Sequence, residues 1–279
     1  MDQVNYNGLL KNLPDPLFSA HNRAFRYGDG LFESMRMFEG YIPLLDRHVY
    51  RLMKGLKTLR FELPAHYGLD FFQTEIQKLI STPISARIRL SVFRQAGGLY
   101  TPISNRPAFL IEAIPLESNR YEFAPEGLEI GLYTDHQLPC HPLSNLKASN
   151  SLIYVLASMY RKENGLGECI LLNHKGWVAE GCSSNVFLVK KEALYTPPLS
   201  EGIIPGIMRE LVIERSPLPV KQIPIYPDEL ETADEIFLTN AVQGIKWVKS
   251  YKNTTFNATV SKHISQLVNQ HLHEENTRC

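Results

Sequence analysis

The sequence mixes strand-like and helix-like segments in both of its halves, and this mixture limits the folds that it can adopt. Residues 86–94, ARIRLSVFR, alternate apolar and polar side chains, which predicts a half-buried strand, and 107–116 is its expected partner. Residues 46–60 instead carry apolar side chains at helical spacing. Because the strands and helices follow no regular βαβ rhythm, their order predicts an α+β fold rather than a doubly wound sheet.

A polar segment near the middle of the chain predicts a domain boundary. Residues 117–127, ESNRYEFAPEG, show no periodic apolar pattern and contain a proline and a glycine. A chain of 279 residues has room for two domains. We therefore expect an N-terminal α+β domain at 1–117, a linker at 118–126 and a C-terminal α+β domain at 127–279.

Charge and composition argue against several functional classes. The 29 Lys and Arg residues balance 29 Asp and Glu residues, whereas a nucleic-acid binder needs a cationic excess. No run approaches the roughly 18 apolar residues that span a membrane, so we expect no membrane partner. The four cysteines form no CxxC pair and the nine histidines form no metal-ligand motif, which predicts free thiols and no metal. Since the first residues show no secretory pattern, we expect a cytoplasmic protein.

Lys147 is the most informative residue for chemistry. It stands at the start of a helix that we predict from about Lys147 to Glu163. The partial positive charge of a helix N-terminus disfavours an ammonium group, and only a neutral amine attacks a carbonyl. The position is therefore compatible with a lysine that forms a Schiff base, although a solvated lysine would show the same pattern.

Three further features could bind a charged or phosphorylated ligand. Glu180 lies among apolar strand segments, where a carboxylate needs a hydrogen-bond donor or a cation such as a pyridinium nitrogen. Arg51 follows Arg47 by one helical turn, and its fork of donors suits a phosphate. Residues 205–209, PGIMR, predict a turn and a helix start, whose free amides can bind phosphate. Each feature taken alone also fits an ordinary structural role.

Taken together, these features resemble the class IV aminotransferases, which are pyridoxal-phosphate enzymes of fold type IV. The resemblance covers nearly the whole chain, from about residue 23 to residue 248. Six blocks carry it: RYGDGLFES (26–34), RHVYRL (47–52), LKASNSLIYVLA (146–157), GWVAEGCSSNVFLV (176–189), IIPGIMRELVI (203–213) and DEIFLTNAV (234–242).

The resemblance implies a fold, a cofactor and a set of site residues. The fold would have two domains, the second a pseudo-barrel, in a homodimer with the site at the domain interface. The cofactor would be pyridoxal 5'-phosphate, bound to Lys147 as a Schiff base, with Lys147 also acting as the acid and base. Glu180 would pair with the pyridine nitrogen. Arg51 and the backbone amides of Ile207 and Met208 would hold the phosphate.

Three activities share this framework. Branched-chain aminotransferases usually have a tyrosine five residues after the lysine, where this chain has Leu152, with Tyr154 two residues further. D-amino acid aminotransferases bind the substrate carboxylate with an arginine and a histidine in the loop that matches 94–102, and this loop has no histidine. The 4-amino-4-deoxychorismate lyases often end the matching strand in Asn-Ala, as in Asn240 and Ala241 here.

Our first hypothesis is transfer of an amino group between an amino acid and a 2-oxo acid. The alternative is the lyase reaction on an amino-chorismate substrate, which releases pyruvate and forms p-aminobenzoate. A non-catalytic protein that binds pyridoxal phosphate is a third alternative. Asn240 and Ala241 are further candidates for cofactor binding, and Phe32, Arg94 and Tyr100 are candidates for substrate binding.

Overall fold

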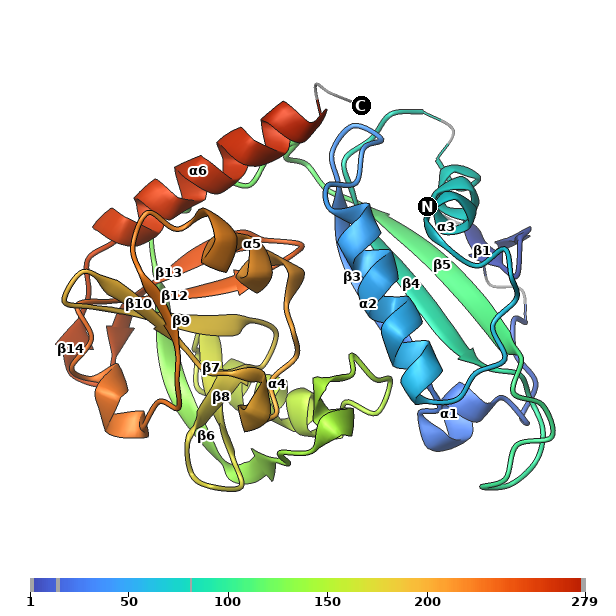
Figure 1. Ribbon diagram of the computed structural model, residues 1–279, viewed down its shortest axis with the longest axis horizontal. Helices are drawn as coiled ribbons and strands as arrows, with labels where there is room; N and C mark the ends of the chain where they lie inside the picture. Colours follow the sequence, from blue (N-terminus) through green and yellow to red (C-terminus); the bar gives the residue numbers. More distant parts are fainter. Residues whose placement is uncertain (1–2, 14–15, 81, 277–279) are drawn as a thin grey trace. The chain divides into compact units, whose positions relative to one another are not determined.

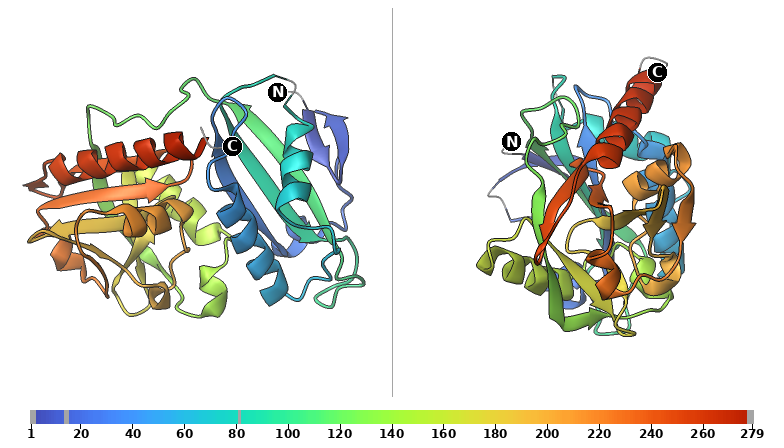
Figure 2. Two further views of the ribbon diagram at one scale, coloured as in Figure 1. Left: turned by 45° about the horizontal axis from the view of Figure 1, so that its top comes forward. Right: turned by 90° about the vertical axis from the view of Figure 1, so that its left-hand side faces the viewer.

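The computed structural model describes residues 3–13, 16–80 and 82–276 (Figures 1 and 2). It divides into two compact units. Unit 1 contains Met1–Asn119 and Lys147–Asn150, and unit 2 contains Arg120–Leu146 and Ser151–Cys279. Unit 1 therefore includes a short segment from within the expected C-terminal domain, and that segment begins with Lys147.

Unit 1 is built on one antiparallel sheet. The strand order is β2-β1-β5-β4-β3, so that β3 lies at an edge. The predicted strands at 86–94 and 107–116 and the predicted helix at 46–60 are confirmed, as β4, β5 and α2. The elements are β1 (Gln3–Tyr6), β2 (Leu9–Asn12), α1 (Arg23–Tyr27), β3 (Gly30–Met37), α2 (Leu45–Thr58), α3 (Leu69–Gln77), β4 (Ala86–Arg94) and β5 (Pro107–Pro115).

The two faces of the unit 1 sheet differ in character. Helices α2 and α3 lie on the same side of it (Figure 2), and apolar residues such as Met35 and Leu52 fill the layer between. Along β3 buried residues alternate with half-buried ones, because successive side chains of a strand point to opposite faces. The second face of β3 and β4 carries Phe32, Ser34, Arg36, Arg87, Arg89 and Ser91, all half-buried.

Unit 2 combines a mixed sheet with three α-helices. The strand order is β11-β10-β9-β12-β13-β6-β7-β8, and β14 pairs with β13. The predicted helix after Pro205-Gly206 is confirmed as α5, and the quoted block at 234–242 contains β12. The elements are β6 (Leu128–Leu138), a 3-10 turn (Pro142–Asn145), α4 (Leu152–Glu163), β7 (Glu168–Asn173), β8 (Val178–Gly181), β9 (Asn185–Lys190), β10 (Ala193–Thr196), a 3-10 turn (Leu199–Glu201), α5 (Ile207–Arg215), β11 (Val220–Gln222), a 3-10 turn (Pro227–Leu230), β12 (Glu235–Asn240), β13 (Gly244–Tyr251), β14 (Thr254–Thr255) and α6 (Thr259–Asn276).

The prediction that a helix begins at Lys147 is wrong. Helix α4 begins at Leu152, and Lys147–Asn150 is paired with the edge strand β3. Phe32 donates its backbone N–H to the carbonyl of Lys147 at 2.9 Å, and Ser149 donates to the carbonyl of Gly30 at 2.9 Å. An edge strand has unpaired backbone groups, and hydrogen bonds to them hold this segment outside the helix.

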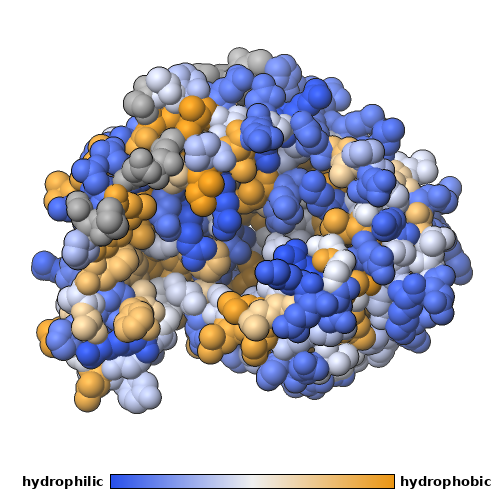
Figure 3. Space-filling view, turned by 180° about the vertical axis from the view of Figure 1, so that it is seen from behind, coloured by the Kyte–Doolittle hydropathy of each residue, from blue (hydrophilic) through white to orange (hydrophobic). Residues whose placement is uncertain are grey.

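The face in Figure 3 is largely hydrophilic, and its apolar side chains lie in separate patches. Among the described residues, none of the helices combines the length and the hydropathy that crossing a membrane requires.

Candidate active site

Lys147 lies beside Phe32 in unit 1. The two residues are directly opposite one another across the pairing with β3, so their side chains leave the same face. The Lys147 Nζ atom lies 4.7 Å from the centroid of the Phe32 ring. Backbone hydrogen bonds on both sides of Lys147 hold this segment, so the strand pairing, and not a helix N-terminus, positions the amine.

A buried ion-pair cluster in unit 1 orients Arg51. Glu33 on β3 accepts two hydrogen bonds from Arg51 on α2, from Nε at 2.8 Å and from Nη2 at 2.5 Å. His48 Nδ1 lies 2.7 Å from the same carboxylate. Burial would raise the pKa of Glu33, but Arg51 and His48 outweigh it and lower this pKa to about 2. Glu33 is therefore ionised at neutral pH and fixes the guanidinium of Arg51.

His48 is the neutral member of this cluster. Burial lowers its pKa below 6.5 although Glu33 opposes the shift, and the charges of Arg51 and Lys147 lower it further. A neutral imidazole beside an ionised carboxylate must donate from the nitrogen that faces it, so His48 Nδ1 carries the hydrogen. The charge of Lys147 thus acts on the cluster that holds Arg51, within the same unit.

Glu180 is a buried carboxylate in unit 2 that accepts hydrogen bonds from three neutral donors. It lies on β8 with 3% of its surface exposed. Tyr154 donates its hydroxyl to Oε1 at 2.6 Å, and Oε2 accepts from the Asn185 amide at 3.0 Å and from the Ile204 backbone N–H at 3.1 Å. Burial and the charge of Glu180 raise the pKa of Tyr154 well above 10, so the tyrosine remains a donor.

The first turn of α5 in unit 2 has the features of an anion site. Ile207 and Met208 are its first two residues, and amides in a first turn have no carbonyl partner within the helix. Gly206 precedes them, and a Cβ atom there would collide with the carboxamide of Asn185. Thr239 lies directly opposite Asn185 in the sheet, and its buried hydroxyl has no hydrogen-bond partner among the described residues.

Asn240 and Ala241 form the turn that follows β12. The Asn240 side-chain oxygen accepts hydrogen bonds from the amides of Val242 at 3.0 Å and Gln243 at 2.8 Å. The Ala241 carbonyl accepts one from the Tyr121 hydroxyl at 2.6 Å. The side-chain oxygen of Asn240 therefore shapes the turn itself.

The three substrate candidates lie in different environments. Phe32 lies beside Lys147, as described above. Arg94 is buried and donates to Asp29 at 3.0 Å, to Asn105 at 2.6 Å and to the carbonyl of Leu59 at 2.8 Å. Tyr100 is 89% exposed. Through these contacts Arg94 joins separate loops of unit 1. We therefore do not assign Arg94 to substrate binding.

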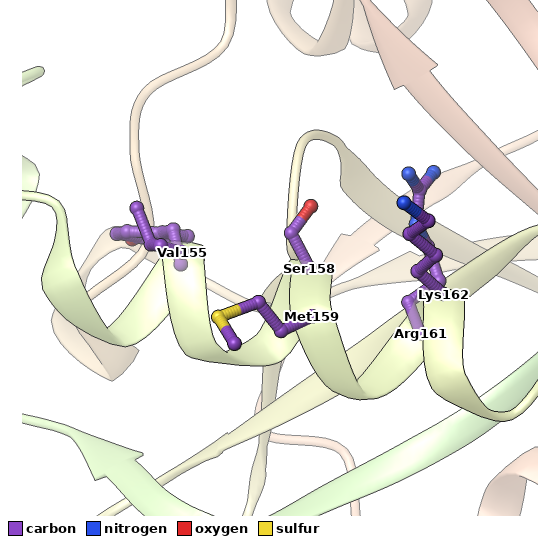
Figure 4. Close-up of a pocket in the computed structure, with 6 residues that line it drawn as sticks. Val155, Ser158, Met159, Arg161 and Lys162 are labelled. Carbon is purple, nitrogen blue, oxygen red and sulfur yellow. The ribbon is translucent and has the colours of Figure 1, made fainter.

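Two other features of unit 2 are a cluster around Glu168 and a shallow pocket that Tyr154 also lines. Cys182 donates to Glu168 at 2.5 Å, and Ser183 and Ser184 donate to the other oxygen of Glu168. With Cys169 these atoms have the spacing of metal ligands, but their mutual hydrogen bonds already account for the cluster. A shallow pocket over α4 is lined by Tyr154, Val155, Ser158, Met159, Arg161 and Lys162 (Figure 4).

Sequence reasoning missed several residues of these clusters. Glu33 and His48 lie in quoted blocks, but only the fold shows that both reach Arg51. Asn185 is a polar residue at the start of an apolar strand, and this position in the sequence could have marked it as a candidate site residue. Tyr154 was considered only for its distance along the chain from Lys147, whereas its partner is Glu180.

The chain matches the family model described as amino-transferase class IV over residues 30–251. It therefore belongs to the class IV aminotransferase family, as the sequence blocks predicted, and it is an enzyme of this family of pyridoxal-phosphate proteins.

Different relatives of this chain have different activities. A Methanocaldococcus jannaschii protein assigned as a branched-chain-amino-acid aminotransferase is 31% identical over 250 residues, which cover 87% of this chain and 85% of the relative. The aminodeoxychorismate lyase of Bacillus subtilis is 30% identical over 253 residues, which cover 86% and 83%. The two identities are nearly equal, so they do not distinguish the aminotransferase activity from the lyase activity.

A solved structure confirms the fold. The branched-chain amino acid aminotransferase from Thermobaculum terrenum, in its pyridoxal-phosphate form, is similar to this chain with a TM-score of 0.86. The two share 20% sequence identity, and the match covers 99% of this chain and 95% of the other. The predicted α+β architecture of fold type IV is therefore confirmed.

Proposed function

We propose that this enzyme uses pyridoxal 5'-phosphate to transfer an amino group between an amino acid and a 2-oxo acid. The observation that carries the proposal is the buried Glu180 carboxylate, which three neutral donors hold. A buried carboxylate in such a place can pair with a protonated ring nitrogen. The first turn of α5 and the orphaned hydroxyl of Thr239 suit a phosphate in the same unit. The donor set therefore fits the cofactor.

The roles of the individual residues follow from their positions. When bound, the cofactor supplies a carbonyl that condenses with amines and a ring that accepts electrons from the substrate carbon. Lys147 Nζ is the amine that we assign to the covalent bond and to moving the proton of the substrate. Glu180 keeps a proton on the ring nitrogen. Arg51, in the orientation that Glu33 fixes, binds phosphate together with the amides of Ile207 and Met208.

Reconstitution tests this proposal. Purified protein incubated with pyridoxal phosphate should become yellow, and hydroxylamine should release the colour. Supplying amino acids together with a panel of 2-oxo acids should then give new amino acid products, detected by chromatography. A protein that stays colourless and forms no product would contradict the proposal.

The lyase reaction is the second candidate function. Its support is the similarity to the Bacillus subtilis enzyme and the Asn240-Ala241 turn. Both reactions require proton removal by the same amine, so the same residues serve either one. Offering aminodeoxychorismate and measuring pyruvate and p-aminobenzoate separates the two reactions, because transamination would form neither of these products from it.

We also propose that the enzyme is a homodimer that acts in the cytoplasm. Helix α4 bears an apolar stripe that is exposed in a single chain: Leu152 at 72%, Val155 at 51%, Leu156 at 39% and Met159 at 51%. Such a stripe suits contact with another protein surface. Sedimentation velocity should show a dimer that Val155→Glu weakens; a wild-type monomer would contradict it.

The free thiols among the described residues support the proposed location in the cytoplasm.

A further inference from the structure

Arg209 is a buried cation in the first turn of α5. It is the third residue of the helix, and 5% of its surface is exposed. Both features disfavour a positive charge, because burial removes its water and the helix dipole already places partial positive charge at this end. The contacts of the side chain must therefore offset the cost of placing an arginine here.

The hydrogen bonds of Arg209 join the first turn of α5 to the edge of the unit 2 sheet. Nε donates to the hydroxyl of Thr196 at 3.3 Å, and Nη2 donates to the carbonyl of Pro197 at 2.9 Å and to the side-chain oxygen of Gln222 at 2.9 Å. Thr196 on β10 and Gln222 on β11 are register partners in a parallel pair. One guanidinium therefore spans the ends of two strands, which the rigid fork of donors in arginine allows.

The same contacts extend to the residues around Gly206, which precedes α5. Thr196 donates its hydroxyl to the carbonyl of Val186 at 2.8 Å, and Val186 follows Asn185 on β9. A Cβ atom at Gly206 would collide with the carboxamide of Asn185 and would lie 3.4 Å from Cβ of Arg209. Gly206 therefore adjoins both side chains, and together they fix the backbone that leads into the free amides of the first turn.

The hydrogen-bond acceptors of Arg209 are all neutral. Among the described residues, no carboxylate accepts a hydrogen bond from it. Burial lowers the pKa of Arg209 to about 10, although the charges of Glu180 and Glu210 oppose the shift, so the guanidinium is charged at neutral pH. This charge and the helix dipole have the same sign, and both favour an anion at this end of α5.

We propose that Arg209 is a positioning residue for the phosphate of the cofactor. Its three hydrogen bonds fix the first turn of α5, and its charge strengthens the attraction of that turn for an anion. Donors bind an anion more tightly when their directions are fixed before it arrives. The proposal rests on the proposed function, because it takes the amides of Ile207 and Met208 as phosphate donors.

Two unreactive ligands test the proposal. Pyridoxine 5'-phosphate and pyridoxine differ only by the phosphate, and neither has the aldehyde that reacts with an amine. Calorimetry with the full-length protein, freed of cofactor, gives the ratio of the pyridoxine dissociation constant to that of pyridoxine 5'-phosphate, which measures the contribution of the phosphate. Arg209→Gln should lower this ratio at least about tenfold and leave pyridoxine binding close to that of wild type. Arg209→Lys, which keeps the charge but loses the fork, should lower it less.

Arg215→Gln is the matched control. Arg215 is the last residue of the same helix and is exposed, so its loss should leave the ratio unchanged. Circular dichroism shows whether each variant is folded, and Arg209→Lys decides by the same ratio if Arg209→Gln is not. Thermal unfolding gives a second readout: inorganic phosphate should raise the Tm of the Arg209 variants less than that of wild type.

The outcomes separate this proposal from the proposed function. A ratio that is unchanged in the folded Arg209 variants would overturn the positioning role and leave the aminotransferase proposal intact. An equal loss of affinity for both ligands would also overturn it, because it would show a general loss of structure in unit 2. A wild-type protein that forms no amino acid product, but whose phosphate-dependent binding falls in Arg209→Gln, would contradict the proposed function and support the role of Arg209. Failure of the wild type to bind pyridoxine 5'-phosphate would overturn both.

Discussion

The two units hold a buried carboxylate in opposite ways. Glu33 in unit 1 is bonded to the cation Arg51 and to His48, which lower its pKa to about 2. Glu180 in unit 2 receives its hydrogen bonds from a tyrosine, an amide and a backbone N–H. Glu33 thus forms an ion pair, whereas the tyrosine, amide and backbone donors to Glu180 are neutral. Burial of a carboxylate alone would not have separated the two roles.

The largest effect should come from the amine of unit 1. Lys147→Ala should lower turnover by about 10⁴-fold, because no other group replaces the base that moves the proton. The fold should persist, since backbone hydrogen bonds hold this segment. Steady-state kinetics with circular dichroism measures both, and Lys54→Ala, at an exposed position of α2, is the control. Turnover near the wild-type rate would refute the role of Lys147.

The carboxylate of unit 2 should give the next largest effect. Glu180→Gln keeps the shape of the side chain but removes the charge, so turnover should fall by about 10²–10³-fold. The absorbance spectrum of the bound cofactor should change as well, because the ring nitrogen loses its partner. Glu126→Gln, at an exposed position, should change neither property. A normal spectrum with normal turnover would remove the distinction between Glu180 and Glu33.

Glu33 should affect stability in a pH-dependent way. Its pKa is about 2 in the folded protein against 4.5 in the unfolded chain, so its charge stabilises the fold by about 3 kcal/mol above pH 5. This stabilisation is lost as the pH falls from 5 towards 2. Glu33→Gln should therefore lower the free energy of unfolding at pH 7, with a difference from wild type that shrinks towards pH 2. Urea unfolding at several pH values measures it, and a difference independent of pH would contradict the ion-pair account.

Tyr154 should give the smallest effect of the four. Tyr154→Phe removes a hydrogen bond to Glu180, which costs about 1–2 kcal/mol, or roughly tenfold in turnover. Its effect should be much reduced in the Glu180→Gln background, because the charged acceptor is gone. A double-mutant cycle of turnover measures this coupling. Additive effects would show that Tyr154 does not act through Glu180.

The sequence predicted the parts of the fold that depend on local pattern. Strands β4 and β5 and helix α5 follow from alternation and from a Pro-Gly turn. The start of α4 could not be predicted in this way, because pairing with the edge strand β3 holds the segment with Lys147 outside the helix. That pairing joins residues distant in the sequence, and no local periodicity records it.

Contacts between residues distant in the sequence also limit what could be predicted of the candidate site. Lys147 and Glu180 could be proposed from sequence blocks, but their partners depend on the fold. The later start of α4 sets the direction of Tyr154, which explains why its hydroxyl reaches Glu180.

The central claim is that Lys147 is the amine that bonds the cofactor. Reduction of the reconstituted protein with borohydride, followed by proteolysis and mass spectrometry, tests it most directly. We predict a single modified peptide, with the pyridoxyl phosphate group on Lys147. A label on another lysine, or no label in a protein that is yellow and active, would contradict the claim.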